Sequence, residues 1–303
     1  MSGRRRFVCA AAVLGLLATA CSSTPAAKAP ASTAPPPRAL LYVSLGDSYA
    51  AGYQPTGPHS GRTGTNGFAY QVPALAAKKG WDLKLVNFGC GGATTESILH
   101  SRGCSQLGPG ATPYPTESQA TAAEAFIRSH RGELGLITVS IGGNDVTACA
   151  AVASPIPCVE QAVKRIKRNL GVLLRGLRAA AGRSVRIVGT TYPDVILGLY
   201  VSDDASLRNL AEISVPAFRD FINPALKQEY EAHGAAFVDV TAATGAYGSL
   251  KQTTTLAPYG KVPLPVAKVC ELTYFCQYHD IHPRTPGYTV IATLIVATLP
   301  QHG

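Results

Sequence analysis

The sequence is poor in charged residues. They make up 15% of the 303 residues, whereas hydrophobic residues make up 46%, and this balance excludes a chain that is disordered throughout. The formal net charge is +9, but the sequence has no cluster of Lys and Arg interleaved with aromatic residues. A surface that follows a phosphate backbone would need such a cluster, so we expect no nucleic-acid partner.

Several enzyme motifs are also missing. The sequence contains no Gly-x-Ser-x-Gly elbow, no Ser-x-x-Lys, no His-Glu-x-x-His and no Gly-x-x-x-x-Gly-Lys phosphate loop. These absences argue against the enzyme classes that depend on those motifs. No two cysteines have the Cys-x-x-Cys spacing of a zinc knuckle. We therefore expect neither a metal nor a cofactor.

The N-terminus resembles a bacterial export signal. Three arginines, Arg4 to Arg6, precede the uncharged apolar run 7–18, which is too short for a membrane-spanning helix of about 20 residues. The run ends in small residues before Cys21, as in a lipoprotein signal, and the arginines resemble a twin-arginine signal. Ordinary cleavage nearby and a plain secretory route remain the alternatives.

These features predict the domain organisation. We expect a signal peptide over 1–20 and a lipid-anchor cysteine with a Pro/Ala-rich tether over 21–38. One folded domain then spans 39–303, in an exported cell-envelope lipoprotein or secreted protein. Its membrane contact would come only through the N-terminal lipid.

Six further cysteines follow the tether. An even number of cysteines in an exported chain favours disulfides over free thiols, although six cysteines allow fifteen connectivities. They fall into three couples that are close in sequence, and we predict pairing within each couple: Cys90 with Cys104, Cys149 with Cys158, and Cys270 with Cys276.

Strand-like and helix-like patterns alternate along the folded part. The expected strands are 40–45, 83–88, 136–141, 185–190 and 236–240, and the expected helices are 67–79, 117–130, 159–181, 205–232 and 288–299. This alternation predicts an α/β domain with a parallel sheet covered on both faces. The segment 242–280 has no clear periodicity, and we expect a long loop or cap beside the site.

Small polar residues follow three of the expected strands, and a fourth polar segment precedes the last helix. In open α/β sheets, sites form beyond the carboxyl ends of the strands. Ser48 follows the first strand, glycines around Gly92 follow the second, Asn144 follows the third, and His282 precedes the last helix. Acyl transfer from an ester needs a nucleophile, a base that takes its proton, and donors for the oxyanion. Ser48, His282, the glycine amides and Asn144 supply these groups.

The four segments resemble those of the SGNH (GDSL-like) hydrolases. Gly46-Asp47-Ser48, the Gly92 segment, Gly142-x-Asn144-Asp145 and His282 occur in the family's order. The resemblance implies a flavodoxin-like three-layer αβα sandwich. It also implies a serine esterase or lipase with Ser48 as nucleophile and His282 as base, and an oxyanion hole of Ser48, Gly92 and Asn144. The cysteine couples and Tyr192-Pro193 resemble those of exported actinobacterial members.

One position departs from the family pattern. The family places Asp three residues before the catalytic His, but His279 occupies that position and Asp280 lies two residues before His282. Asp280 is our predicted third member. The alternatives are a backbone carbonyl such as that of His279, or another acid such as Asp194.

The motifs predict hydrolysis of a small-molecule or lipid carboxylic ester. An acyltransferase that passes the acyl group to a sugar or lipid alcohol would use the same site, and an inactive lipid-anchored binding protein is the rival from another class. We expect the substrate pocket to be lined by the loops 52–66, 93–116, 146–157 and 242–278, which carry no readable code for the acyl chain.

Overall fold

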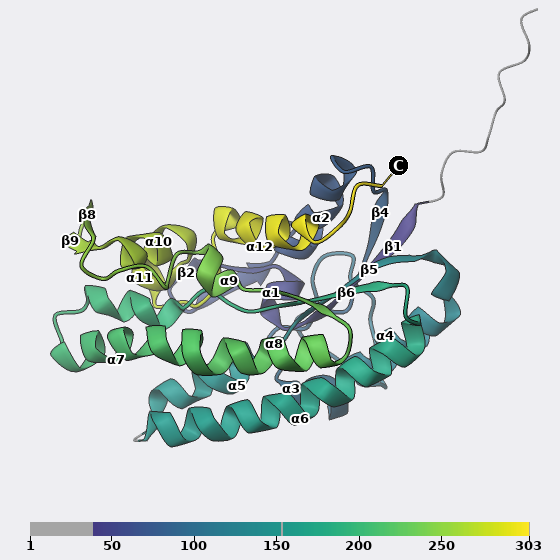
Figure 1. Ribbon diagram of the computed structural model, residues 1–303, viewed down its shortest axis with the longest axis horizontal. Helices are drawn as coiled ribbons and strands as arrows, with labels where there is room; N and C mark the ends of the chain where they lie inside the picture. The colour runs from purple at the N-terminus through teal and green to yellow at the C-terminus, as the bar shows by residue number, and fades with distance from the viewer. Residues whose placement is uncertain (1–38, 153, 303) are drawn as a thin grey trace, which may run out of the picture. The chain divides into compact units, whose positions relative to one another are not determined.

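The centre of the fold is a sheet of five parallel strands (Figure 1). β1 (Leu40–Gly46), β4 (Leu83–Asn87), β5 (Leu134–Ser140), β6 (Arg186–Thr190) and β7 (Ala236–Val238) lie in the order β4-β1-β5-β6-β7. The computed structural model describes residues 39–152 and 154–302, so the predicted signal peptide, Cys21 and the tether lie outside the described residues. The strand order is flavodoxin-like, and the predicted α/β class is confirmed.

Helices cover both faces of this sheet. α2 (Phe68–Ala77) and α12 (Thr285–Ala297) pack on one face, and α3 (Thr95–His100), α4 (Gln119–Ser129), α6 (Pro155–Ala181) and α8 (Asn223–Ala232) pack on the other (Figure 1). Alternate residues of β1 therefore enter different cores: Tyr42 lies with α2 and α12, and Val43 lies with α6. All seven residues of β5 are buried, as expected for a central strand covered on both sides.

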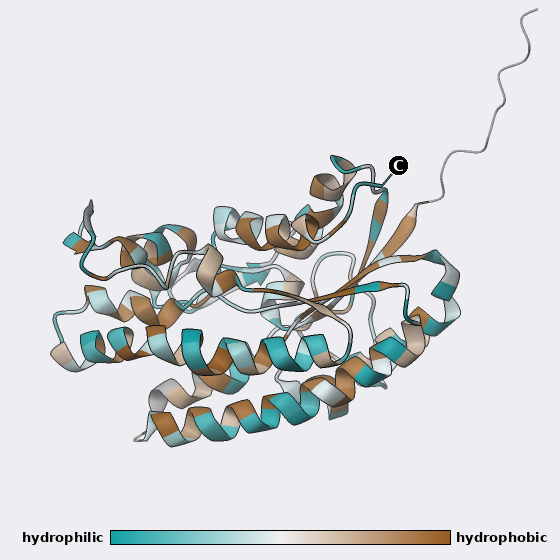
Figure 2. Cartoon of the chain, in the orientation of Figure 1, coloured by the Kyte–Doolittle hydropathy of each residue, from teal (hydrophilic) through white to brown (hydrophobic). Residues whose placement is uncertain are grey.

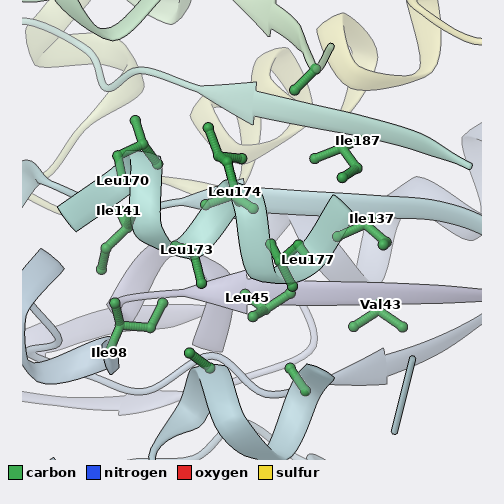
Figure 3. Packing of buried hydrophobic residues seen from close by; sticks show 14 of the residues in the cluster. Val43, Leu45, Ile98, Ile137, Ile141, Leu170, Leu173, Leu174, Leu177 and Ile187 are labelled. Atoms are coloured by element: carbon green, nitrogen blue, oxygen red, sulfur yellow. The ribbon is translucent and has the colours of Figure 1, made fainter. Parts of the chain in front are cut away.

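The long helix α6 shows how the sequence pattern becomes packing. Its apolar residues recur every three or four positions, and they form one buried stripe. Figure 3 shows Leu170, Leu173, Leu174 and Leu177 from this stripe against the side chains of the strands. The other face of α6 is polar, and Figure 2 shows this banding along the helix.

The predicted helix over 205–232 is interrupted in its middle. α7 (Ala205–Pro216) is followed by a π-helical segment, η4 (Ala217–Ile222), and then by α8. Pro216 lies at the junction and has no backbone N–H to donate to the preceding turn, which favours a local departure from α-helical geometry.

The segment 242–280, for which we expected a long loop or cap, has regular secondary structure. It contains the hairpin of β8 (Thr253–Leu256) and β9 (Gly260–Pro263), followed by α10 (Leu264–Leu272) and α11 (Phe275–Tyr278). Val262, Val266 and Val269 form a small core with η3 (Val195–Val201) and α7. Pro265 marks the first turn of α10, where proline is favoured, so it starts a helix here.

The remaining elements are short. They are α1 (Ser48–Ala51), the hairpin of β2 (Tyr53–Gly57) and β3 (Ser60–Thr63), η1 (Arg131–Glu133), α5 (Gly143–Thr147), η2 (Ala148–Ala151) and α9 (Val240–Ala243). None of the described helices combines the length and the apolar character that a membrane span requires.

The three predicted disulfides are present. Their Cα–Cα distances are 5.8 Å for Cys90–Cys104, 5.6 Å for Cys149–Cys158 and 5.1 Å for Cys270–Cys276. All three distances lie in the range that a disulfide requires.

Candidate active site

Ser48 follows the carboxyl end of β1, the strand that lies between β4 and β5 in the sheet. Gly46 adopts a φ of +141°, and a Cβ there would lie 2.0 Å from the carbonyl oxygen of Ser140 on β5. Only glycine allows this approach of the two strands. Ser48 follows as the first residue of α1, and it is 6% exposed. The close strand contact therefore fixes the point from which Ser48 projects.

Asp47 is a buried carboxyl directly before Ser48. Its Oδ1 accepts a hydrogen bond from the backbone N–H of Tyr49 at 2.9 Å, which caps α1, and its Oδ2 accepts one from the Tyr192 hydroxyl at 2.5 Å. Burial raises the pKa of Asp47 to about 7; the hydrogen bonds oppose this effect, and the charge of Asp145 adds to it. Asp47 thus holds the turn that presents Ser48.

The segment after β4 is tied to the segments after β1 and β5. The backbone N–H of Cys90 donates to the carbonyl of Gly46 at 3.0 Å, and the Asn144 amide donates to the carbonyl of Ala93 at 2.8 Å. Gly92 lies between these two links with a φ of +76°. One N–H of the Asn144 amide is thereby held, and the orientation of its second N–H is fixed.

Asp145 adds a further link between these segments. Its carboxylate accepts hydrogen bonds from the backbone N–H and the hydroxyl of Thr95, at 2.9 Å and 2.7 Å. The Asn-Asp pair after β5 therefore holds the loop after β4 at two places.

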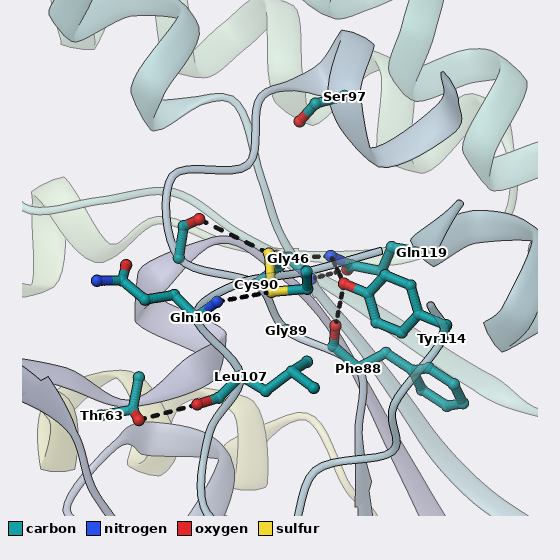
Figure 4. The surroundings of a disulfide bond; sticks show 12 residues. Gly46, Thr63, Phe88, Gly89, Cys90, Ser97, Gln106, Leu107, Tyr114 and Gln119 are labelled. Atoms are coloured by element: carbon teal, nitrogen blue, oxygen red, sulfur yellow. Dashed lines mark hydrogen bonds between the residues drawn. A yellow bond between two sulfur atoms is a disulfide. The ribbon is translucent and has the colours of Figure 1, made fainter. Parts of the chain in front are cut away.

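Gln119 contributes a link that the sequence analysis missed. This buried side chain at the start of α4 accepts from the Gly46 N–H at 2.7 Å and donates to the Gly46 carbonyl at 3.0 Å. It also donates to the Tyr114 hydroxyl, which donates in turn to the Phe88 carbonyl (Figure 4). A glutamine in a helical pattern carries no sequence signal for this role, because its partners are backbone groups.

His282 lies within hydrogen-bond distance of both Ser48 and Asp280. Its Nε2 is 2.7 Å from Ser48 Oγ, and its Nδ1 is 2.7 Å from Asp280 Oδ1. The side chains of His282 and Asp280 are 13% and 25% exposed. Burial alone would raise the pKa of Asp280, but the hydrogen bonds and charge of His282 outweigh it and hold this pKa below its ordinary value.

Neighbouring aromatic residues and a backbone bridge hold the His282 loop. The Tyr49 hydroxyl donates to the Ile281 carbonyl at 2.5 Å, and the Tyr53 ring lies 4.4 Å from the imidazole between centroids. The backbone N–H of Tyr274 donates to the His282 carbonyl at 3.0 Å. The imidazole is thus held from both sides, by contacts that the motifs did not reveal.

The two alternative acceptors, Asp194 and the His279 carbonyl, make no hydrogen bond to His282 Nδ1. Asp194 caps η3, where it accepts from the backbone N–H of Leu197 and from the Ser214 hydroxyl. His279 ends α11 in the left-handed conformation, with a φ of +53°. Of the three candidates, the Asp280 carboxylate lies within hydrogen-bond distance of Nδ1.

No group of three or more His, Cys, Asp and Glu side chains in the described part of the chain is placed to hold a metal ion.

A cavity of about 340 Å³ opens beside Ser48. Our expectation about its lining was wrong for three of the four loops, because α6, η3, α7, η4 and α8 provide most of the wall. Of the four loops, only 146–157 contributes to it.

The model of the GDSL-like Lipase/Acylhydrolase family matches residues 44–290. The chain belongs to this family. The match includes Ser48, Gly92, Asn144 and His282, so the resemblance drawn from the four segments is confirmed at the level of the family. This GDSL-like chain is a carboxylic ester hydrolase.

Solved structures with related folds include several esterases. They are an acetyl xylan esterase from Geobacillus stearothermophilus (18% identity, 85% of this chain and 93% of that chain, TM-score 0.47), an extracellular lipase from Streptomyces rimosus (20%, 84% and 100%, 0.43) and an aryl esterase from M. smegmatis (12%, 86% and 97%, 0.47). No curated protein sequence matches the chain. These likenesses are distant, so membership of the GDSL-like family rests on the sequence match.

Proposed function

We propose that this GDSL-like hydrolase cleaves carboxylic esters through an acyl-enzyme on Ser48. The observation that carries the proposal is a chain of two hydrogen bonds. Ser48 Oγ lies 2.7 Å from His282 Nε2, and His282 Nδ1 lies 2.7 Å from Asp280 Oδ1. These are distances at which protons are transferred between side chains. The order of nucleophile, base and carboxylate is that of a serine hydrolase triad.

The chemistry follows from this arrangement. His282 Nε2 takes the proton of Ser48 as Oγ attacks the ester carbonyl, and it then gives that proton to the departing alcohol. A water molecule, activated by the same nitrogen, releases the acid from Ser48. Asp280 holds the imidazole with Nδ1 protonated and stabilises the imidazolium that forms at each step.

The oxyanion needs donors that are in place before the reaction. We assign this role to the backbone N–H groups of Ser48 and Gly92 and to the second N–H of the Asn144 amide. The hydrogen bond from Asn144 to the Ala93 carbonyl supports the assignment, because it ties the side-chain donor to the loop that carries Gly92. The three donors would then respond together to any movement of that loop.

The test is hydrolysis of p-nitrophenyl acetate by the full chain and by Ser48→Ala. We expect the substitution to remove nearly all activity, since Ser48 has the only hydroxyl of the described residues that forms a hydrogen bond with His282 Nε2. A fluorophosphonate should label the unsubstituted chain at Ser48. Full activity of Ser48→Ala would contradict the proposal, and absence of both labelling and hydrolysis would favour a binding protein.

Adding a long-chain alcohol to the assay separates hydrolysis from acyl transfer. We propose water as the acceptor, so the free acid should remain the main product. A new ester as the main product would assign acyl transfer to the same site.

We also propose that the enzyme acts outside the cytoplasm, anchored through Cys21. Three disulfides within one chain are typical of an oxidising compartment, and this supports export. The anchor rests on the lipoprotein-like sequence that ends at Cys21.

A further inference from the structure

An apolar cavity extends from the candidate active site between the helices of one face. Ser48, Gly143 and Asn144 line it at the site, and it has a volume of about 340 Å³. This volume lies within the range of pockets that hold small molecules. The cavity is therefore continuous with the atoms that would meet an ester carbonyl.

The wall of the cavity away from Ser48 is made mainly of aliphatic and aromatic side chains, with Glu160 and Asn223 among the few polar ones. Ile166 of α6, Ile222 of η4 and Leu226 of α8 are buried there. The hydroxyl of Ser214, which also lines the cavity, donates to Asp194 and is therefore engaged within the protein. Such a wall favours a ligand made of methylene groups over one that needs hydrogen bonds.

The π-helical segment η4 forms another part of the wall. Phe218, Phe221 and Ile222 all line the cavity and follow the proline at the end of α7. π-Helical turns occur often at functional sites. Here the wider turn supplies two aromatic side chains to the same cavity.

The mouth of the cavity is apolar as well. Among the described residues, six large hydrophobic side chains are exposed, and three of the six line this cavity: Ile156 (62% exposed), Phe221 (42%) and Ile213 (40%). Exposed apolar side chains gathered at one opening indicate contact with an apolar ligand.

The position of His282 decides which part of an ester this cavity would hold. The alcohol must leave from beside His282 Nε2, because that nitrogen gives it a proton. Ser48 and Asn144 line the cavity and His282 does not, although its neighbour Ile281 does. This placement favours the acyl chain over the alcohol as the occupant of the cavity.

We infer that the enzyme is selective for esters with a medium or long straight acyl chain, and that this chain lies in the cavity between α6 and η4. The inference rests on the proposed role of Ser48. The chain would pass from Ser48 along Ile166 and Ile222, and its end would leave between Ile156 and Phe221.

The first test compares kcat/KM for p-nitrophenyl acetate, butanoate and octanoate on the full chain, at concentrations below micelle formation. Each methylene that the cavity buries should raise kcat/KM by about fourfold. Octanoate should therefore exceed acetate by about a hundredfold if the cavity buries three or four of its additional methylenes, and by about 4,000-fold if it buries all six. A parallel series of acetate esters with longer alcohols should show no such rise. A rate that falls from acetate to octanoate, or a rise with the alcohol instead, would overturn the inference.

The second test uses variants of the cavity with the ratio of octanoate to acetate kcat/KM as the readout. Phe221→Ala should lower this ratio about tenfold, and Ala217→Phe, which fills the cavity, should lower it as well. Leu264→Ala is the matched control, because Leu264 is a large apolar residue with similar exposure (39%) outside the cavity. Equal ratios in Phe221→Ala and Leu264→Ala would contradict the inference even if Ala217→Phe fails to fold.

The outcomes separate this inference from the proposed function. Hydrolysis of acetate that depends on Ser48, without a preference for octanoate, would refute the acyl cavity alone. Hydrolysis of octanoate that survives Ser48→Ala, or hydrolysis of no ester, would refute both.

Discussion

Asp280 contacts His282 twice through one carboxylate oxygen. Oδ1 accepts from the backbone N–H of His282 at 2.9 Å and lies 2.7 Å from its Nδ1. His279, directly before Asp280, ends α11 in the left-handed conformation. The turn brings the carboxyl two residues before the histidine to the ring nitrogen, where a carboxyl three residues before would be usual for the family.

We expect Asp280→Asn to lower kcat by about 10⁴, because an amide cannot stabilise the imidazolium and favours the wrong tautomer of His282. The measurement is steady-state hydrolysis of p-nitrophenyl acetate. His279→Asn is the matched control, since asparagine tolerates a left-handed φ and should change kcat less than tenfold. A loss of tenfold or less in Asp280→Asn would instead indicate a Ser–His dyad.

The sequence predicted most residues of this candidate site but left its third member open. Ser48, Asn144 and His282 follow recognisable segments, and their segments do lie together in the fold. The choice between Asp280 and a backbone carbonyl depends on the φ of His279, which no local motif specifies. Gln119 and Tyr49 act through backbone carbonyls, so their residue types gave no indication of a role.

The loop between β4 and α3 is the element on which the proposed oxyanion hole depends. The Cys90–Cys104 disulfide closes a segment of sequence separation 14 that contains Gly92, and the N–H of Gly91 donates to the carbonyl of Gln106 at 3.0 Å. The disulfide thus joins the loop that carries Gly92 to the segment that follows α3 (Figure 4).

We expect the double variant Cys90→Ser/Cys104→Ser to lose about 2–3 kcal/mol in the free energy of unfolding. It should also lose kcat with less change in KM for acetate, because a looser Gly92 loop weakens contacts made in the transition state. Urea unfolding and steady-state kinetics measure the two effects. Cys149→Ser/Cys158→Ser should lose stability with a smaller fall in kcat, and an equal fall in both variants would contradict the assigned role of the Gly92 loop.

The sequence predicted those strands and helices whose buried residues recur at regular spacing. The five strands and α6 have apolar residues at strand or helical spacing, and the structure contains them near the expected bounds. The cavity wall was missed because residues such as Ile166 and Ile222 fit the same helical pattern as core residues. The β8–β9 hairpin was missed because its partly exposed residues show no clear alternation.

Two buried carboxyls should make the stability of the whole molecule depend on pH. Burial raises the pKa of both Asp47 and Asp194 to about 7, and hydrogen bonds oppose this effect. An unfolded aspartate has a pKa of about 3.9. Between these values the folded chain holds protons that the unfolded chain releases, so stability falls as pH rises. The contribution is complete below about pH 4 and is lost as pH rises through about 7.

We expect Asp194 alone to raise the free energy of unfolding by about 2 kcal/mol at pH 5 relative to pH 7. Asp194→Asn should remove this difference, while its amide oxygen can still accept from the Leu197 N–H. Urea unfolding at pH 5, 6 and 7 is the measurement, with Asp203→Asn as a control at an exposed carboxyl. The same pH dependence in Asp194→Asn and the unsubstituted chain would show that Asp194 is ionised in the folded protein.

The contact between Ser48 and His282 joins residues that are 234 positions apart in the chain. Ser48 is synthesised long before His282, and α12, which follows His282, is needed to cover the sheet. A nascent chain that has not reached His282 therefore carries the serine without the group that activates it. Esterase activity would appear only after the chain has been made and folded through α12, so the lipids and esters of the cell that makes it are not exposed to an active enzyme during synthesis.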